Sequence, residues 1–224
     1  GAERNGTAPS VNFFGGDPML MWDGLIEPLV RRIRRERRPF RFSITTNGTL
    51  LTEERMDAMR EYGFGLLLSM DGVRAVQDAN RPFLGGGGSF EALERAVPGA
   101  LRRWPGVTMR MTAAPWSCAG LFESILWAEG AGFKSFFVVP DVFSRWDVRS
   151  WALLEREVVK YAAHAAERRA AGEGYIRFSS FARAEADLGA LKTPEGRARL
   201  AALGRAENKC GLGAGRFAPI APDG

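Results

Sequence analysis

The stretch that decides the fold is 11–18, which reads Val-Asn-Phe-Phe-Gly-Gly-Asp-Pro. A short apolar run that stops at paired glycines is typical of a buried strand followed by a tight loop. Similar runs recur, and the expected strands are Val11–Phe14, Phe40–Thr45, Phe64–Ser69, Val107–Thr112 and Phe133–Val139. Amphipathic stretches between them predict helices at 22–37, 52–61, 89–103 and 119–131. Strands that alternate with helices about every 30 residues predict a parallel sheet, either doubly wound or closing into a barrel.

The pattern changes after the fifth expected strand. Residues 150–171 predict one long helix that contains His164, and a short strand is expected within Tyr175–Phe181. Residues 183–206 are rich in Ala and Arg and predict further helix. We therefore expect a β/α domain over 1–148, a helical connector over 149–208 and the beginning of another domain over 209–224. Because the chain begins without Met and ends in a turn-like Asp-Gly pair, we expect a fragment of a longer protein.

The composition excludes several classes of protein. One histidine and two cysteines, Cys118 and Cys210, are too few for a zinc finger, a complete iron–sulfur site or a disulfide scaffold. The scarcity of cysteine favours a reducing, cytoplasmic location. No apolar run approaches the ~20 residues that a membrane-spanning helix needs, so no membrane partner is expected.

The net charge of +5 is weak evidence for nucleic-acid binding, because only four of the 31 basic residues are lysines and the arginine bias is typical of GC-rich coding. The densest basic run, Arg31–Arg38, lies opposite apolar positions of the same expected helix. A solvated helix face explains this run better than a phosphate-binding stripe, and nucleic acid is disfavoured as a partner.

Small and polar residues follow the expected strands at their carboxyl ends. Examples are Gly15–Pro18, Thr45–Gly48, Ser69–Gly72 and Thr112–Pro115. In parallel β/α folds these ends lie along one edge of the sheet, where ligands bind. Any one such segment could be a simple turn, because Asn-Gly and Asp-Gly pairs form turns readily. Together they predict a polar ligand site, and composition leaves its chemistry open.

Three of these segments also resemble a known family. Phe13–Pro18 is similar to the F-x-G-G-E-P signature on the second strand of radical S-adenosylmethionine enzymes, and Ile44–Leu51 resembles their third-strand Thr-Asn-Gly-Thr segment. Leu68–Gly72, followed by Arg81, resembles the fourth-strand segment of one subgroup. This subgroup contains the anaerobic sulfatase-maturating enzymes and the peptide maturases that carry a SPASM domain. Cys210 and the glycines after it resemble the opening of that domain.

The resemblance implies a fold. We expect an α/β protein with a partial (β/α)6 TIM-type barrel whose first β/α unit is missing, so that strands 2–6 fill the radical S-adenosylmethionine core at 1–148. The helical connector and the truncated start of a SPASM auxiliary-cluster domain would follow.

The resemblance also implies contacts to S-adenosylmethionine. Gly15, Gly16 and Asp17 would receive the methionyl ammonium, mainly through backbone acceptors, because an ammonium has three donors and no acceptor. Asp17 replaces the usual glutamate on a shorter arm, so no direct contact from its side chain is expected. Ser69 and Arg81 would hold the ribose or the methionyl carboxylate.

Further positions follow from the same resemblance. Asn47 would either contact the ribose or only shape its turn. Val139 would flank the adenine through apolar contact. Cys210 would be a ligand of an auxiliary [4Fe–4S] cluster that residues beyond the chain complete.

The implied activity needs parts that this chain lacks. The C-x3-C-x2-C motif that binds the catalytic [4Fe–4S] cluster would precede Gly1, so no catalytic residue is expected in the chain and the fragment alone is expected to be inactive. The whole enzyme would cleave S-adenosylmethionine reductively and abstract hydrogen from a peptide or protein substrate, with flavodoxin or ferredoxin as reductant. Arg216 stands where sulfatase-maturating enzymes have a further cysteine, which favours a peptide maturase over formylglycine formation.

Two other functions remain open. The chain could be a catalytically inactive β/α module that binds a peptide or nucleic acid. An unrelated phosphate-binding β/α enzyme is disfavoured, because no strand end carries a P-loop or dinucleotide fingerprint. Among isolated side chains, we expect Asp71 to stabilise its turn, Cys118 to be a small buried residue, Asp141 to be an exposed turn acid and His164 to be a packing or surface residue.

Overall fold

The computed structural model describes residues 8–179 and 193–195. The chain divides into two units, Gly1–Phe178 and Ser179–Gly224, and the fold below is that of the first. Apart from 193–195, the residues of the helix expected over 183–206 lie outside the described residues, as do those from Cys210 onward.

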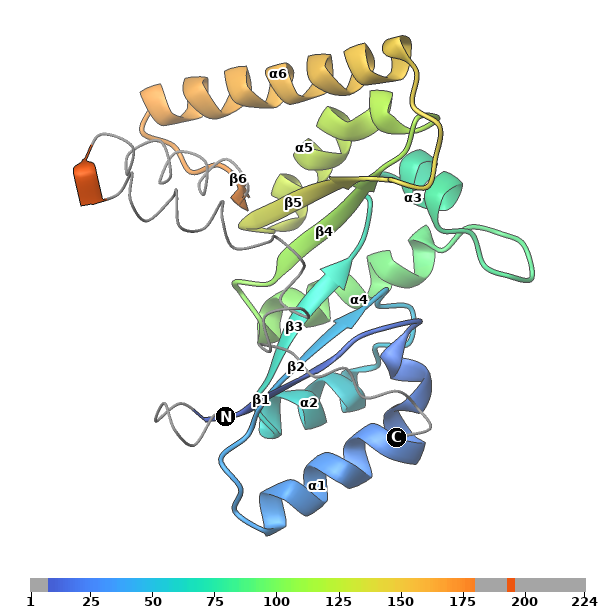
Figure 1. The fold of residues 1–224 in the computed structure, drawn as a ribbon, viewed down its shortest axis with the longest axis vertical. Coiled ribbons are helices and arrows are strands. Elements are labelled where there is room, and N and C mark those ends of the chain that lie inside the picture. The colour runs from blue at the N-terminus through green and yellow to red at the C-terminus, as the bar shows by residue number, and fades with distance from the viewer. Residues whose placement is uncertain (1–7, 180–192, 196–224) are drawn as a thin grey trace. The chain divides into compact units, whose positions relative to one another are not determined.

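A parallel sheet forms the centre of this unit (Figure 1). Its strands are β1 (Ser10–Phe13), β2 (Arg41–Thr46), β3 (Phe64–Ser69), β4 (Thr108–Ala113), β5 (Ser135–Pro140) and β6 (Arg177–Phe178). They pair in chain order, with every neighbouring pair parallel. The expected parallel β/α sheet is confirmed, and β1–β5 lie within two residues of the predicted strands.

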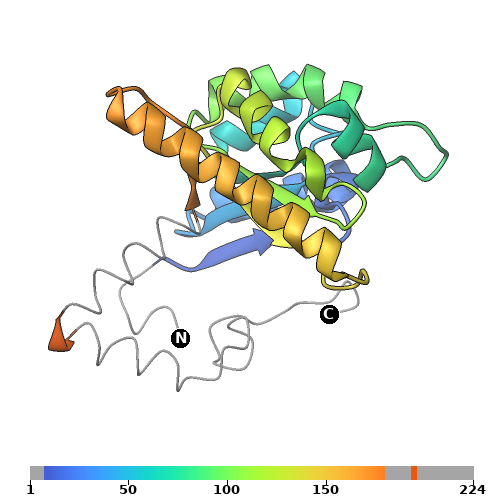
Figure 2. The same cartoon turned by 90° about the horizontal axis from the view of Figure 1, so that it is seen from above.

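The helical segments connect consecutive strands. They are η2 (Pro18–Met21), η3 (Trp22–Ile26), α1 (Glu27–Arg35), α2 (Glu53–Glu61), α3 (Arg74–Asn80), α4 (Phe90–Arg103), η4 (Cys118–Gly120), α5 (Leu121–Ala131) and α6 (Val148–Ala170). The strands are adjacent in chain order, and connections between parallel strands are right-handed. Right-handed connections that always lead to the next strand on the same side place every connecting helix on one face of the sheet. Figure 2 shows the described helices on one side of the sheet, so no described helix covers the other face, which is called the helix-free face below. Among the described strands β1 and β6 are the two edges, so the sheet is an open, partial barrel.

The core lies between the sheet and the helices. Alternate strand residues such as Phe42, Phe64, Met109 and Phe136 are buried there. Phe42 and Phe64 stack with a ring-centroid distance of 5.4 Å, and Phe13 extends the stack at 5.8 Å from Phe64. This packing identifies the face of each strand: the residues between these buried ones are directed to the helix-free face.

Two local features differ from the sequence prediction. The helix expected at 22–37 begins as a single π-helical segment, η3, and becomes regular only at Glu27. Pro28 has no N–H to donate to the carbonyl of Gly24, so the regular hydrogen-bond ladder cannot start earlier. Helix α3 was not expected, because seven residues are too few for a clear apolar period. The residues that precede two of the helices differ in their contacts: the Thr52 side chain accepts the Arg55 N–H and caps α2, whereas the Ser89 side chain makes no capping bond to α4.

The long helix α6 belongs to the same unit as the sheet. It packs on α5 and η4, and β6 pairs with β5 after it. The first part of the predicted connector is therefore joined to the sheet, while the boundaries at 148 and 208 stay a prediction. Within 8–179 and 193–195, no helix combines the length and apolar character required to cross a membrane.

Candidate functional site at the carboxyl edge of the sheet

The loop after β1 contains the glycine pair. Gly15 and Gly16 have φ of +106° and +55°, in the left-handed region that glycine adopts without strain. No atom lies within 4 Å of the position that a Cβ would take at either residue. The backbone of this loop is therefore open to a ligand.

Asp17 fixes the loop to the neighbouring strand. Its carboxylate accepts hydrogen bonds from Thr46 Oγ1 at 2.9 Å, from the Asn47 N–H at 3.1 Å and from the Met19 N–H at 3.0 Å. Both carboxylate oxygens are engaged by these donors. The side chain of Asp17 thus positions the glycine loop against the end of β2.

Asn47 shapes the turn after β2. Its Oδ1 accepts hydrogen bonds from the Thr49 N–H at 2.9 Å and from Thr49 Oγ1 at 2.7 Å. Gly48 follows with φ of +79°, and a Cβ there would lie 2.6 Å from Leu68 Cδ1. Asn47 therefore shapes its turn, which is one of the two roles left open for it. The Nδ2 of Asn47 has no hydrogen bond to another described residue.

Ser69 ends β3 on the helix-free face. Its neighbour Leu68 is directed the other way, towards Gly48 and the core. Ser69 is 6% exposed, and its hydroxyl makes no hydrogen bond to another described residue. Within the described part of the chain no buried side-chain oxygen or nitrogen lacks a hydrogen-bond partner, so the unbonded Ser69 Oγ keeps some accessible surface and is open to a ligand or to water.

Arg81 is bound to Asp71. Its Nε donates to Asp71 Oδ2 at 2.8 Å and its Nη2 donates to Asp71 Oδ1 at 3.1 Å. The same carboxylate accepts from Asn80 Nδ2 at 3.1 Å and from the Thr112 N–H at 2.7 Å. Nη2 of Arg81 also donates to Thr112 Oγ1 at 3.1 Å. The charge of Arg81 is therefore neutralised within the protein, and only its Nη1 lacks a partner among the described residues.

The strand register brings several of these positions together. Val139 of β5 is the register partner of Thr112, and Ser69 of β3 is the register partner of Arg110. All four side chains leave the sheet on its helix-free face, near the carboxyl edge. Gly15, Gly16, Asp17 and Asn47 follow β1 and β2 at this same edge. Of the residues selected from the sequence, only Cys210 lies outside the described residues.

The described residues contain no group of three His, Cys, Asp or Glu side chains that could hold a metal ion. Cys118 is buried, its Sγ lies 3.5 Å from two backbone carbonyls, and burial raises the pKa of its thiol. His164 lies 3.1 Å from Glu129 Oε2 and packs against the ring of Phe122. Both residues have the packing roles expected from the sequence, and this part of the chain supplies no ligand set for an iron–sulfur cluster.

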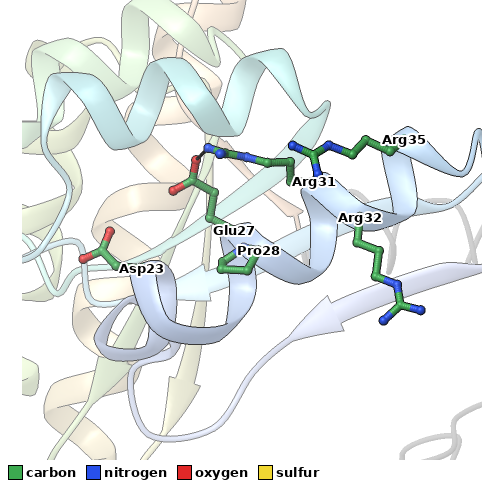
Figure 3. Close-up of a pocket in the computed structure, with 6 residues that line it drawn as sticks. All are labelled: Asp23, Glu27, Pro28, Arg31, Arg32 and Arg35. Carbon is green, nitrogen blue, oxygen red and sulfur yellow. Dashed lines mark hydrogen bonds and ion pairs between the residues drawn. The ribbon is translucent and has the colours of Figure 1, made fainter.

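A groove of about 370 Å³ runs along η3 and α1 (Figure 3). Its walls are Asp23, Glu27, Pro28, Arg31, Arg32 and Arg35. Glu27 Oε1 accepts a hydrogen bond from Arg31 Nη2 at 2.6 Å, and Asp23 Oδ2 accepts one from Arg55 Nη2 at 2.6 Å. The groove is thus a charged surface of one helix whose carboxylates are already paired, and we do not assign it a ligand.

The sequence interpretation missed the roles of Thr46, Thr112 and Asp71 in this site. Thr46 holds Asp17, whereas Thr112 and Asp71 hold Arg81. These residues lie in or directly after the expected strands, but the pairings join positions that are 10 to 31 residues apart in the sequence. No local pattern predicts such pairings.

Comparison with known proteins identifies the family. The profile of the Radical SAM superfamily matches residues 1–115, more than half of the 224-residue chain. A radical SAM cyclopropyl synthase, TigE of Paramaledivibacter caminithermalis, is 30% identical over 69 residues, which are 31% of this chain and 15% of that protein.

Solved structures show the same fold. Native anSMEcpe with bound AdoMet and the Kp18Cys peptide has a TM-score of 0.63 at 19% identity, over 74% of this chain and 49% of that chain. Native anSMEcpe with bound AdoMet has a TM-score of 0.62 at 18% identity, over 78% of this chain and 51% of that chain. The chain thus spans about half the length of the solved structures that it matches. From the profile match and the shared fold, the chain belongs to the radical S-adenosylmethionine superfamily.

Proposed function

We propose that the chain provides the S-adenosylmethionine-binding part of an enzyme that modifies a peptide or protein. The observation that carries this proposal is the meeting, at one edge of the sheet, of the open glycine loop at Gly15–Gly16 and the Ser69 hydroxyl, which has no hydrogen bond to another described residue. Membership of the superfamily implies S-adenosylmethionine and an iron–sulfur cluster as cofactors.

The geometry supports a role for each residue around the cofactor. Carbonyls of the Gly15–Gly16 loop would accept hydrogen bonds from the methionyl ammonium, which has donors only. Asp17 would act by holding this loop, since both of its carboxylate oxygens are engaged. The Ser69 hydroxyl would bind the ribose or the methionyl carboxylate, and Val139 would pack against the adenine.

Arg81 and Asn47 would contribute less directly. Arg81 has only Nη1 to offer, because Nε and Nη2 bind Asp71. Asn47 has only its Nδ2 to offer the ribose, because its Oδ1 is held in the turn. Cys210 remains our proposed ligand of an auxiliary cluster.

The reaction that we propose is the reductive cleavage of S-adenosylmethionine. One electron from a flavodoxin or ferredoxin would yield methionine and a 5′-deoxyadenosyl radical, and this radical would take a hydrogen atom from a substrate side chain to give 5′-deoxyadenosine. Because the described residues supply no cluster ligands, we assign none of them to the electron-transfer step. Their work is to bind and orient the cofactor.

A peptide is the substrate class that we favour, acted on in the cytoplasm. The anSMEcpe structure with a bound peptide supports it, since that protein shares this fold. Within this class we favour a peptide maturase over formylglycine formation, on the basis of Arg216.

The test uses the full-length protein, purified without oxygen and with its clusters reconstituted. Under reduction, S-adenosylmethionine should give methionine and 5′-deoxyadenosine in equal amounts. No 5′-deoxyadenosine from protein with intact clusters would contradict the proposal and favour a β/α module that binds without catalysis.

A further inference from the structure

The helix-free face of the sheet carries an unbalanced positive charge. None of the six strands contains an aspartate or a glutamate. Arg41, Arg110 and Arg177 alternate with the core residues Phe42, Met109 and Phe178, so their side chains leave on the helix-free face. This face therefore has three guanidinium groups and no carboxylate from the strands.

The arginines of the helical layer are different, because many of them are paired. Arg31, Arg55, Arg74, Arg102 and Arg103 each form an ion pair with a carboxylate. By contrast, the side chains of Arg41, Arg110 and Arg177 form no ion pair or hydrogen bond with another described residue. Arg41 and Arg177 are exposed to solvent, whereas Arg110 is half-buried and lacks an acidic partner among the described residues.

Arg110 is the most informative of the three. It is half-buried in the middle of β4, where most other residues are apolar or hydroxylic. An arginine remains charged at any physiological pH, and a partly desolvated guanidinium gains most from a carboxylate, which it can bind through two parallel hydrogen bonds. Arg110 is also the register partner of Ser69, so it lies one strand away from the proposed cofactor contact.

We propose that Arg110 binds a carboxylate of the substrate, an aspartate or glutamate side chain, and that the helix-free face selects an acidic peptide. This inference rests on the proposed function, which places the peptide beside the cofactor. The three arginines lie on β2, β4 and β6. Arg41 and Arg177 begin β2 and β6 at the amino edge of the sheet, and because adjacent strands are about 4.8 Å apart, the path along the sheet between them is roughly 19 Å. An extended peptide covers that width, whereas the single carboxylate of S-adenosylmethionine does not.

The carboxyl edge offers apolar contacts for the same peptide. Phe14, Trp116 and Phe143 follow β1, β4 and β5, and each has more than half of its surface exposed. Aromatic and arginine side chains are both enriched at surfaces that bind peptides and proteins.

The test measures binding of two synthetic peptides to the full-length protein by fluorescence anisotropy. One is a fluorescein-labelled Gly-Ser peptide of twelve residues with four glutamates, and the other has glutamine at those four positions. The protein should bind the glutamate peptide about tenfold more tightly, because hydrogen bonds between charged groups are stronger than neutral ones. Arg110→Gln should remove most of this preference, and Arg110→Lys should keep part of it.

Arg102→Gln is the matched control, because Arg102 lies on α4 and is paired with Glu53. It should leave the preference unchanged. Equal binding of the two peptides, or an unchanged preference in Arg110→Gln, would overturn the proposal. An equal loss of S-adenosylmethionine affinity in Arg110→Gln would also overturn it, by assigning Arg110 to the cofactor. The formation of 5′-deoxyadenosine by the unsubstituted protein tests the proposed function separately, so the two failures can be told apart.

Discussion

Arg81 and Asp71 form a two-bonded ion pair at the carboxyl edge of the sheet, with Nε donating to Oδ2 at 2.8 Å and Nη2 donating to Oδ1 at 3.1 Å. The Asp71 side chain is 1% exposed and that of Arg81 is 26% exposed. Asp71 follows β3, Arg81 follows α3, and the same carboxylate accepts the N–H of Thr112 in β4. One buried carboxylate therefore joins three elements of the candidate site.

Replacing Arg81 by alanine should destabilise the fold. The substitution leaves the Asp71 carboxylate buried without its cation, which typically costs about 3–5 kcal/mol. Urea denaturation followed by circular dichroism measures the change. Arg74→Ala is the control, because Arg74 and Glu91 form an exposed pair at 3.1 Å, and it should cost less than about 1 kcal/mol. Equal losses of unfolding free energy in the two variants would show that the buried pair stabilises the fold no more than the exposed pair does.

Replacing Gly48 by alanine should also destabilise the fold. A Cβ at this position would lie 2.6 Å from Leu68 Cδ1 and 2.7 Å from Leu93 Cδ2, at a φ of +79°. Crowding of a packed core together with a left-handed backbone should cost about 1–3 kcal/mol. Gly106→Ala is the control, since nothing lies within 4 Å of its Cβ position, and it should change the unfolding free energy by less than about 0.5 kcal/mol. A stable Gly48→Ala protein would contradict the close approach in this turn.

The start of α6 should weaken in acid. The Asp147 carboxylate accepts hydrogen bonds from Ser150 Oγ and from the Ser150 N–H, each at 2.7 Å. These bonds lower the pKa of the Asp147 carboxyl below its usual value, and the bond from the hydroxyl has the larger effect. A depressed pKa stabilises the folded state above the unfolded-state pKa of about 3.9, and this stabilisation is lost as the pH falls through the lower, folded-state pKa.

Asp147→Asn tests this expectation, because asparagine also caps helices but does not titrate. Thermal unfolding between pH 6 and pH 2 should depend less on pH in Asp147→Asn than in the unsubstituted protein. The same pH dependence in both proteins would count against a titrating cap.

Cys118 should react slowly with alkylating reagents. It is 1% exposed, and burial raises the pKa of its thiol, so little reactive thiolate forms near neutral pH. In the 224-residue chain with Cys210→Ser, where Cys118 is the one cysteine left, iodoacetamide should label the native protein at least about tenfold more slowly than the urea-unfolded protein. Similar rates in the two states would show that the Cys118 thiol is accessible.

The order of strands and most helices could be predicted from the sequence, because the signals are local. Val11–Phe14 and Phe64–Ser69 are short apolar runs that end at polar turn residues, and both became strands with at most one residue of difference. Helix α3 was missed because its seven residues carry no clear period. The edge of the sheet at which we propose a ligand site followed from the parallel order, so the positions of Ser69 and Val139 were foreseeable.

The partners of the charged side chains could not be predicted. Asp17 is held by Thr46, and Arg81 by Asp71, through contacts that exist only after strands and helices have packed. Arg110 was overlooked for the opposite reason. In the sequence it is one basic residue in an expected buried strand, and its significance depends on the face to which the strand register directs it.

The central claim is that the carboxyl edge of this sheet binds S-adenosylmethionine through Ser69. The direct measurement is the dissociation constant of S-adenosylmethionine for the full-length, cluster-reconstituted protein by equilibrium dialysis, with Ser69→Ala compared against Ser43→Ala. Ser43 lies on β2 and is the register partner of Gly65 in β3. Gly65 precedes Ser69 by four residues on that strand. Loss of one hydrogen bond should weaken binding by about 2- to 10-fold in Ser69→Ala and leave Ser43→Ala unchanged. Equal affinity in the two variants would contradict this account of the site.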